Sequence, residues 1–457
     1  MSLKSALPLA LLLAGCAAQP PAPDPLPAPP AQWRHANALP AADINAAWWR
    51  AFGSAELDRL IAQAQAQNPD LAAAAARVRQ AEASARLAGA PLLPRLDGNL
   101  GASREGRLGG DADTAGNRYS GGLAASYEVD LWGRLRSERD SAELNRAASV
   151  FDRDALRVTL EAGVASTWLQ GVGLRERVRI GELNLANAER VLATVEARWR
   201  AGAAVALELA QQRGVVATQR RLLAELRQQA EDSRTALAVL LGDSVTRLDS
   251  DAARLAALHA PSLGAGLPSA LLGRRPDLAR AETRLAAAAA DVAAARAALL
   301  PRLDLAAAAG GSSGSLARLF ADPVYSLGAA LTAPIFDGGR LAAERDIAQA
   351  RREELLADYR GAIVAAFADV EVALNALSGS EIQLGEQREV LEQATLAFRL
   401  AEARYRAGAD TLLTLLDAQR TLYAAQDEVA QFHLARLQAS VGLYRALGGG
   451  WQVAPMP

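Results

Sequence analysis

Few side chains of this 457-residue chain could carry out acid–base, nucleophilic or metal chemistry. The three histidines, His35, His259 and His433, lie far apart, and none has a partner at a metal-ligand spacing. Lys4 is the only lysine, which excludes a P-loop lysine, a Schiff base and Ser-x-x-Lys acylation. No zinc, EF-hand or nucleophile-elbow motif is present. The sequence therefore predicts no catalytic centre, no metal and no cofactor, and an enzyme such as a cell-wall hydrolase is disfavoured.

The chain's single cysteine, Cys16, is the one residue that we expect to be modified covalently. Residues 1–15 have a basic start and a short apolar run at 7–14, which is typical of a secretory signal peptide and too short to span a bilayer. Leu-Ala-Gly-Cys at 13–16 resembles the lipobox of bacterial lipoproteins, in which the cysteine carries the lipid. Ala17 follows in place of Asp, which favours the outer membrane. An unmodified cysteine in an ordinary signal peptide is the alternative.

Composition limits the partners. The net charge is -2 and no basic patch with interleaved aromatics occurs, so no nucleic-acid partner is expected. Nine of the twenty prolines fall within the first 40 residues. Residues 16–40 therefore form an extended linker between the lipid and the body of the protein. The whole chain is 51% hydrophobic, which is enough for a large core.

The body of the chain contains one sequence pattern twice. The segments that align without a gap, 206 positions apart, are 119–135 with 325–341 and 196–202 with 402–408. An offset this long indicates a tandem duplication rather than a short-period solenoid. We assign the first repeat to residues 41–250 and the second to 251–457. Each copy is predicted to run helix, strand, loop, strand, very long helix, turn, helix.

Each repeat is predicted to contain one very long helix. Proline is absent between Arg95 and Ala260 and between Ile335 and Ala454, and strong helix formers dominate both windows. The predicted helices are 134–200, 205–241, 340–406 and 411–447. At 1.5 Å per residue, the longest would measure about 100 Å. Apolar residues follow two heptad stripes on the last helix, which indicates a neighbour on each side. A closed ring of helices and a large bundle both fit this pattern.

Short amphipathic strands precede each long helix. The predicted strands are 94–104, 119–131, 301–310 and 325–336. In 119–131 the odd positions are apolar and most even positions polar, as in a tilted transmembrane strand. A soluble sheet covered by helices is the alternative. In a membrane, four strands would leave two open edges and could not close a barrel, so the chain would have to oligomerise into a hollow cylinder.

Six motifs together carry a resemblance to a known family. They are Trp-Trp at 48–49, YEVDLWGR at 127–134, RRPD at 274–277, PIFDGG at 334–339, LLDAQR at 415–420 and ALGGGW at 446–451. With them, nearly the whole mature chain resembles the lipoprotein (OprM/NodT-type) branch of the TolC-like outer-membrane efflux factors. The resemblance implies a homotrimer with a 12-stranded β-barrel in the outer membrane, anchored by lipid and continued across the periplasm by an α-barrel. It also implies a periplasmic adaptor and an inner-membrane pump of the RND type, with drugs or other small molecules as cargo.

The same resemblance implies two sites. The adaptor would meet the turns of the helical hairpins, which here comprise Arg200, Ala201, Gly202, Arg406, Ala407 and Gly408. Leu413 and Asp417 would close the periplasmic entrance as an apolar ring and a carboxylate ring that favours cations. Tyr405 and Arg406 would supply hydrogen bonds that hold the gate shut. The ordinary alternatives are helix caps for the turns and a solvated helix face for Asp417.

The gate is predicted in the second repeat alone. The first repeat has Leu207 and Gln211 at the aligned positions, so it supplies no carboxylate there. Opening would then move the hairpin 340–447 outward from the axis. The competing interpretation of the whole chain is a non-channel periplasmic lipoprotein, either an adaptor or a spacer. The two hairpins and the amphipathic strands argue against it, because an adaptor should carry one hairpin between β-rich halves.

Overall fold

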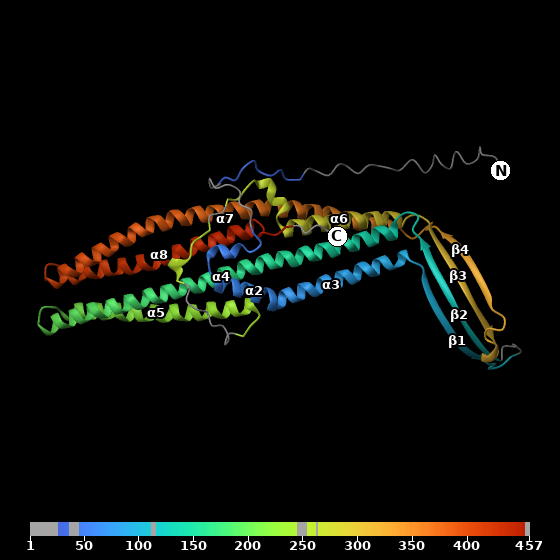
Figure 1. Cartoon of the computed structure of the whole chain (residues 1–457), viewed down its shortest axis with the longest axis horizontal. Helices are drawn as coiled ribbons and strands as arrows, with labels where there is room; N and C mark the ends of the chain where they lie inside the picture. Colours follow the sequence, from blue (N-terminus) through green and yellow to red (C-terminus); the bar gives the residue numbers. More distant parts are fainter. Residues whose placement is uncertain (1–25, 36–44, 111–115, 245–253, 262–263, 453–457) are drawn as a thin grey trace.

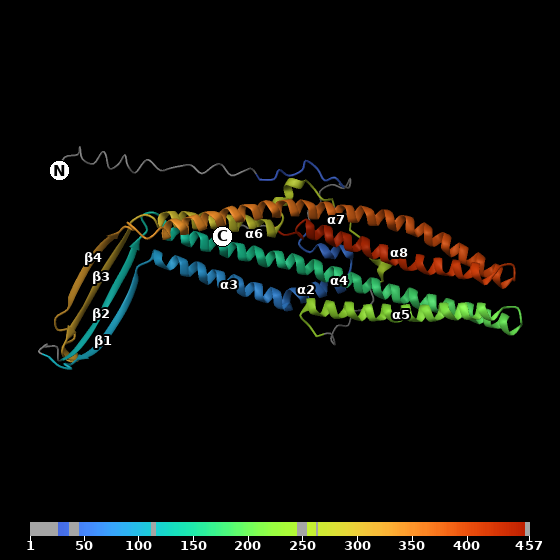
Figure 2. The same ribbon diagram turned by 180° about the vertical axis from the view of Figure 1, so that it is seen from behind.

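The computed structural model describes residues 26–35, 45–110, 116–244, 254–261 and 264–452. The predicted lipidation site Cys16 and its signal peptide lie outside these residues. The described chain forms a long rod, with a β-sheet at one end and the turns of two helical hairpins at the other (Figures 1 and 2). This separation places the two functional regions at opposite ends of the molecule.

The two repeats have the same order of elements, as predicted. The first contains α3 (Pro69–Gly89), β1 (Arg95–Glu105), β2 (Gly116–Val129), α4 (Arg134–Arg200) and α5 (Ala206–Leu241). The second contains α6 (Pro276–Ala297), β3 (Arg302–Ser313), β4 (Val324–Thr332), α7 (Arg340–Arg406) and α8 (Leu412–Ala446). A further helix, α2 (Ala55–Gln67), precedes the first repeat's pattern. The long helices α4 and α7 have 67 residues each, so the prediction of very long helices is confirmed.

The strands differ from the prediction at their ends. β4 ends at Thr332 rather than 336, because Pro334 has no N–H to donate to a ladder. β2 ends at Val129 rather than 131, because the next residue, Asp130, turns to cap α4. β3 continues to Ser313 and β2 starts at Gly116, so both hairpins extend farther than the apolar pattern does.

Each long helix carries two shorter helices along its length. α3 and α5 lie one after the other beside α4, and α6 and α8 lie in the same way beside α7 (Figure 1). α4 also contacts α6 and α8, so the two repeats pack against each other along most of the rod. Small residues allow this close approach, since the Cα of Gly173 in α4 lies against the side chain of Leu434 in α8. A Cβ there would lie only 2.7 Å from Leu434 Cδ2.

The larger of two apolar cores lies in the middle of the rod, around Trp48, Trp168 and Tyr444, which we call the waist. The paired tryptophans of the first motif are buried in it, and the Trp48 ring stacks on Tyr444 with 4.8 Å between ring centroids. The second core lies nearer the hairpin turns and contains residues of α4, α5, α7 and α8. Both hairpins are therefore joined to each other almost to their tips.

Arg275, in the Arg-Arg-Pro-Asp motif, ties three helices together at the waist. Its side chain is only 12% exposed and binds the carboxylates of Asp277 at 2.8 Å and Asp369 at 3.0 Å. It also donates to the carbonyl of Ala446, at 3.3 Å. These bonds raise its pKa against the opposing effect of burial, so it stays charged. The motif thus has a structural role, joining α6, α7 and the end of α8.

The sheet has the antiparallel order β1-β2-β3-β4. Because paired residues point to the same side, the register assigns every side chain to one of two faces. One face is almost wholly apolar and comprises Leu96, Leu100, Leu123, Leu303, Leu305, Tyr325, Leu327 and Leu331 among others. The opposite face carries Asp97, Ser126, Glu128, Asp304, Ser326 and Thr332. The long helices leave most of the apolar face uncovered, and Leu327 is 76% exposed on it. Near its loop end, Leu319 and Phe320 lie against Gly121 on this face.

Candidate functional site

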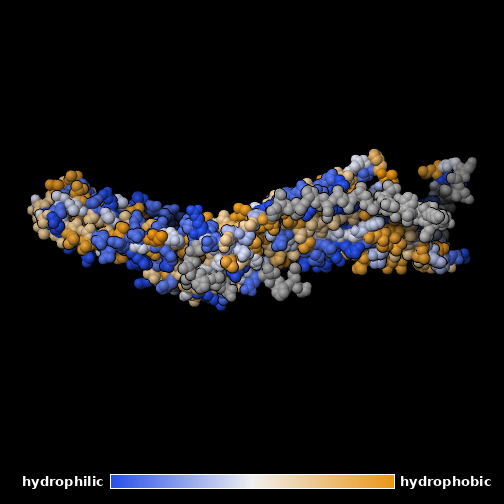
Figure 3. Space-filling view, turned by 90° about the horizontal axis from the view of Figure 1, so that it is seen from above, coloured by the Kyte–Doolittle hydropathy of each residue, from blue (hydrophilic) through white to orange (hydrophobic). Residues whose placement is uncertain are grey.

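The two predicted adaptor-contact turns lie at the same end of the rod (Figures 1 and 2). α4 ends at Arg200 and α7 at Arg406. A glycine in each turn adopts positive φ, 73° at Gly202 and 71° at Gly408. Residues with a Cβ rarely adopt this backbone conformation, so glycine allows the chain to reverse tightly. Figure 3 shows hydrophobic side chains on the surface at both ends of the molecule, around the sheet and at these turns.

Two repeat-related arginines near the turns have different partners. In the second repeat, Arg404 binds Asp410 of its own turn at 3.1 Å. The first repeat has Ala204 at the aligned position. Its arginine, Arg198, instead reaches across to the second hairpin, where Nη1 donates to the carbonyl of Tyr405 at 2.6 Å. The sequence prediction missed Arg198, although the repeated Glu-Ala-Arg-aromatic-Arg-Ala-Gly pattern marks both arginines.

Tyr405 lies inside the core between the two hairpins. Its side chain is 1% exposed, and the Arg198 guanidinium sits 4.7 Å from the centre of its ring. Its Oη has no hydrogen-bond partner among the described residues. Burial raises the pKa of this phenol, so it stays neutral at physiological pH. Among the described residues, Tyr405 therefore joins the hairpins through its ring and its carbonyl. The hydrogen bond that would hold the gate shut stays a prediction.

This arrangement predicts that Tyr405→Phe changes little. An unpaired buried hydroxyl costs about 1–3 kcal/mol, so its removal should leave the thermal midpoint unchanged or slightly raised. Tyr405→Ala should instead lose about 3–5 kcal/mol, because it leaves a cavity and removes the ring under Arg198. Thermal unfolding of the detergent-extracted protein checks both variants. A large loss in Tyr405→Phe would show that Oη has a partner in the assembled protein.

The other predicted gate residues are exposed. Leu413 is 69% exposed and lies one helical turn from Asp417 on α8, so both project from the same flank. Asp417 pairs with Arg420 at 2.8 Å, with both side chains largely exposed. Arg406 pairs with Glu402 of its own helix at 2.7 Å. In the part of the chain that the structure describes, Leu413 and Asp417 are largely uncovered, which leaves them available to line a shared opening.

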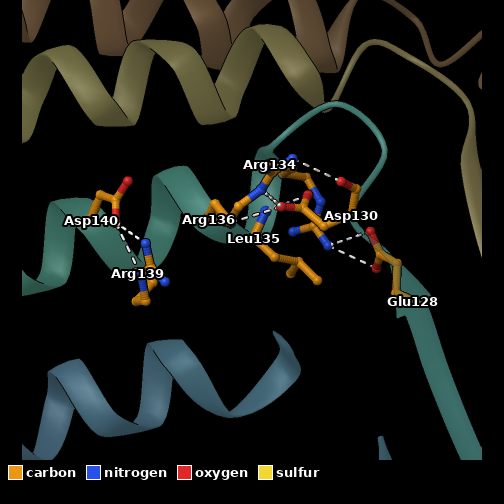
Figure 4. Close-up of polar contacts among 7 residues, drawn as sticks. All are labelled: Glu128, Asp130, Arg134, Leu135, Arg136, Arg139 and Asp140. Carbon is orange, nitrogen blue, oxygen red and sulfur yellow. Dashed lines mark hydrogen bonds and ion pairs between the residues drawn. The ribbon is translucent and has the colours of Figure 1, made fainter. Parts of the chain in front are cut away.

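A network of charges connects the sheet to the long helix (Figure 4). Asp130 accepts hydrogen bonds from the backbone N–H groups of Leu135 and Arg136, which caps the start of α4. Nη2 of Arg134 donates to both carboxylate oxygens of Glu128, at 2.8 Å each. At the start of α7, Asp337 caps in the same way. The YEVDLWGR motif thus fixes the angle between strand and helix.

No group of three His, Cys, Asp or Glu side chains is placed to bind a metal ion among the described residues. α7 is the one described helix apolar and long enough to cross a membrane by composition, but only 33% of that stretch is buried. Its apolar residues therefore lie largely on an uncovered flank of the rod. Such a flank on a long helix requires another surface to cover it.

Comparison with known proteins identifies the family. The model of the outer membrane efflux protein family matches residues 60–243 and 267–449, once for each repeat. The chain belongs to this family. It is an outer-membrane efflux channel, as predicted, with its strands in the membrane and its helices in the periplasm.

Several relatives are similar over nearly their whole length. The pyoverdine export outer membrane protein OpmQ of Pseudomonas aeruginosa is 52% identical, over 99% of this chain and 98% of the relative. The cation efflux system protein CusC of Escherichia coli is 33% identical, over 89% of each chain. The Neisseria gonorrhoeae channel MtrE, solved in an open state, is 29% identical with a TM-score of 0.84, over 94% of this chain and 98% of that one.

Proposed function

We propose that three copies of this efflux channel form one duct, which accepts cargo from a periplasmic adaptor and an inner-membrane pump of the RND type. The sheet carries this proposal. Its apolar face suits lipid, but β1 and β4 each have one unpaired edge among the described residues. Unpaired backbone groups cannot face hydrocarbon, and four strands cannot close on themselves. Three copies give twelve strands, which supports a barrel wide enough to conduct.

The polar face of the sheet then lines the lumen. Asp97 and Asp304, on β1 and β3, lie on this face and pair with Arg95 and Arg302 at 2.8 Å and 3.1 Å. Because α4 follows β2 after a short turn and α7 follows β4 after a short loop, the lumen would continue into a tube of helices about 100 Å long. No chemical step is needed in such a tube, so the protein acts as a passive conduit.

The tips of the hairpins are the place where we propose that the duct closes. Three copies of Leu413 would form an apolar plug at the axis, and three Asp417 carboxylates beside it would favour cations. The adaptor would contact the turns at 200–202 and 406–408. MtrE has an open state, which supports a change of aperture in this architecture. Cys16 would carry the lipid that anchors the assembly.

The cargo proposed first is a siderophore of the pyoverdine class. The support is the 52% identity to OpmQ, whose name states pyoverdine export, over almost the entire chain. Drugs and other small molecules are the broader class. The test is to express this chain in a strain without its pyoverdine outer-membrane channel and to measure extracellular siderophore. Restored export would support this cargo, and export of a drug alone would contradict it.

Imaging of the detergent-extracted protein tests the trimer. Negative staining should show threefold rods about 100 Å long or longer, and native mass spectrometry should give three times the subunit mass. The Cys16→Ser variant is the matched control, because it should lose the lipid and keep the trimer. Compact single-copy particles from both proteins would overturn the shared barrel, and a non-channel helical lipoprotein would replace it.

A further inference from the structure

We propose that neighbouring subunits of the duct join at the tips through Arg404 of one subunit and Trp199 of the next. This inference rests on the proposed trimer. It assigns a specific contact between copies of the chain, and the internal repeat supplies the template for that contact. The pair would reproduce between subunits what Arg198 and Tyr405 do within one subunit.

The template contact is well defined. The Arg198 guanidinium lies over the Tyr405 ring, 4.7 Å from its centroid, and Nη1 donates to the Tyr405 carbonyl at 2.6 Å. The arginine comes from the first hairpin and the aromatic ring from the second. One flank of each hairpin therefore carries the arginine, and the opposite flank carries the aromatic residue.

The repeat supplies the same two groups on the free flanks. At the offset of 206, Arg198 aligns with Arg404, and Tyr405 aligns with Trp199. A ring of three subunits contains six hairpins, in which first and second hairpins alternate. Half of the joints lie within subunits and half between them. If all six use equivalent flanks, Arg404 meets Trp199 of the neighbouring subunit at each joint between subunits.

The flank that carries Trp199 is exposed, as a contact between subunits requires. Trp199 is 47% exposed, whereas its repeat counterpart Tyr405 is 1% exposed. The aligned positions 206 and 412 show the same difference in exposure, because Ala206 is exposed and Leu412 is 1% exposed. Trp, Tyr and Arg are the side chains most enriched among the residues that dominate binding at protein interfaces. The flank of Trp199 is therefore an interface that the isolated subunit leaves uncovered.

Arg404 is exposed and can lie over an aromatic ring of another subunit. Its side chain is 63% exposed, and its Nη1 donates to no group in the described part of the chain. The ion pair with Asp410 engages Nε, along one edge of the guanidinium, and leaves the face of the group open. Cations bind to the face of tryptophan more strongly than to that of tyrosine. Arg404 can therefore keep Asp410 and also cover Trp199.

Photocrosslinking of the full-length, lipidated protein tests the contact. A benzophenone amino acid at position 199 should give crosslinks between subunits, and mass spectrometry should map them to the region of Arg404. The same group at position 405 is the matched control and should give crosslinks within one subunit. Arg404→Gln should lower the yield from position 199 several-fold, whereas Arg198→Gln should leave that yield unchanged.

The thermal stability of the trimer gives a second measurement. Trp199→Ala and Arg404→Ala should each lower the midpoint of trimer dissociation, and the double variant should lose no more than the larger single loss. Additive losses would show that the two residues do not touch. Trimers that crosslink from position 199 only to an adaptor would overturn this contact and leave the proposed duct intact. A protein that forms no trimer would overturn both.

Discussion

Replacing Leu413 and Asp417 together with alanine is expected to raise the conductance of the purified channel in planar bilayers at least tenfold. Leu413 is 69% exposed in the subunit, so in a closed ring its three copies would meet each other rather than the subunit's own core. Alanine removes three carbons from each copy and opens the narrowest part to water. Loss of the Asp417 carboxylates should also weaken the preference for cations. Increased antibiotic sensitivity of cells that express the variant would provide the second measurement.

The repeat offers a matched control for this experiment. Leu207 and Gln211 occupy the aligned positions of the first hairpin, and Leu207 is similarly exposed at 64%. Their double replacement by alanine removes a comparable volume without removing a carboxylate. A smaller rise in conductance is expected, with little change in ion selectivity. If neither double variant changes conductance or sensitivity, the entrance is closed by other residues and the gate proposed here is wrong.

The energy needed to open the gate is limited by what holds the hairpins together. Within a subunit, the second hairpin is joined to the first by the Arg198–Tyr405 contact and by the apolar core around it. A cation over an aromatic ring contributes on the order of 0.5–2 kcal/mol, depending on its desolvation. Breaking a few such contacts at the tips, with the apolar core kept intact, costs only a few kcal/mol. Adaptor binding at the adjacent turns could offset a sum of this size.

The long helices and the two-faced strands were predictable because local sequence determines them. Absence of proline and an excess of helix formers set the lengths of α4 and α7. Alternation in β2 set its faces, and the register then places Leu96, Leu305 and Leu327 on the same side as Leu123. The strand ends were less predictable. The apolar pattern of the second repeat continues to Ile335, but Pro334 ends the ladder first.

The arrangement at the hairpin tips was only partly predictable. Both turns could be placed, because each glycine stands two residues after the end of a long helix. The different partners of Arg198 and Arg404 could not be predicted. They arise because Ala204 stands where the second repeat has Asp410, and because of the way in which the two hairpins pack. The burial of Tyr405 depends on the same packing. Sequence comparison of the repeats marks these positions but does not show which flank is covered.

The sheet provides the last test, because its two faces should respond differently to the same charge. Leu327 and Ser326 are neighbours on β4, but the register points them to opposite faces. Arginine on the lipid face of a barrel costs about 2–4 kcal/mol near the bilayer midplane, whereas a lumen position keeps the charge in water. Leu327→Arg should therefore reduce the amount of folded trimer in the outer membrane at least tenfold, and Ser326→Arg should leave it near the level of the unmodified protein.

The comparison separates two causes of a poor yield. Both variants introduce the same side chain one residue apart, so a general loss of strand propensity or of expression would lower both. A deficit limited to Leu327→Arg can arise only if that face meets lipid. The measurement is the heat-sensitive trimer band in washed outer membranes, together with the conductance of what is inserted. Ser326→Arg should insert normally and shift selectivity toward anions, because its charge lies in the lumen. Equal loss in both variants would place Ser326 away from water and overturn the assignment of the polar face to the lumen.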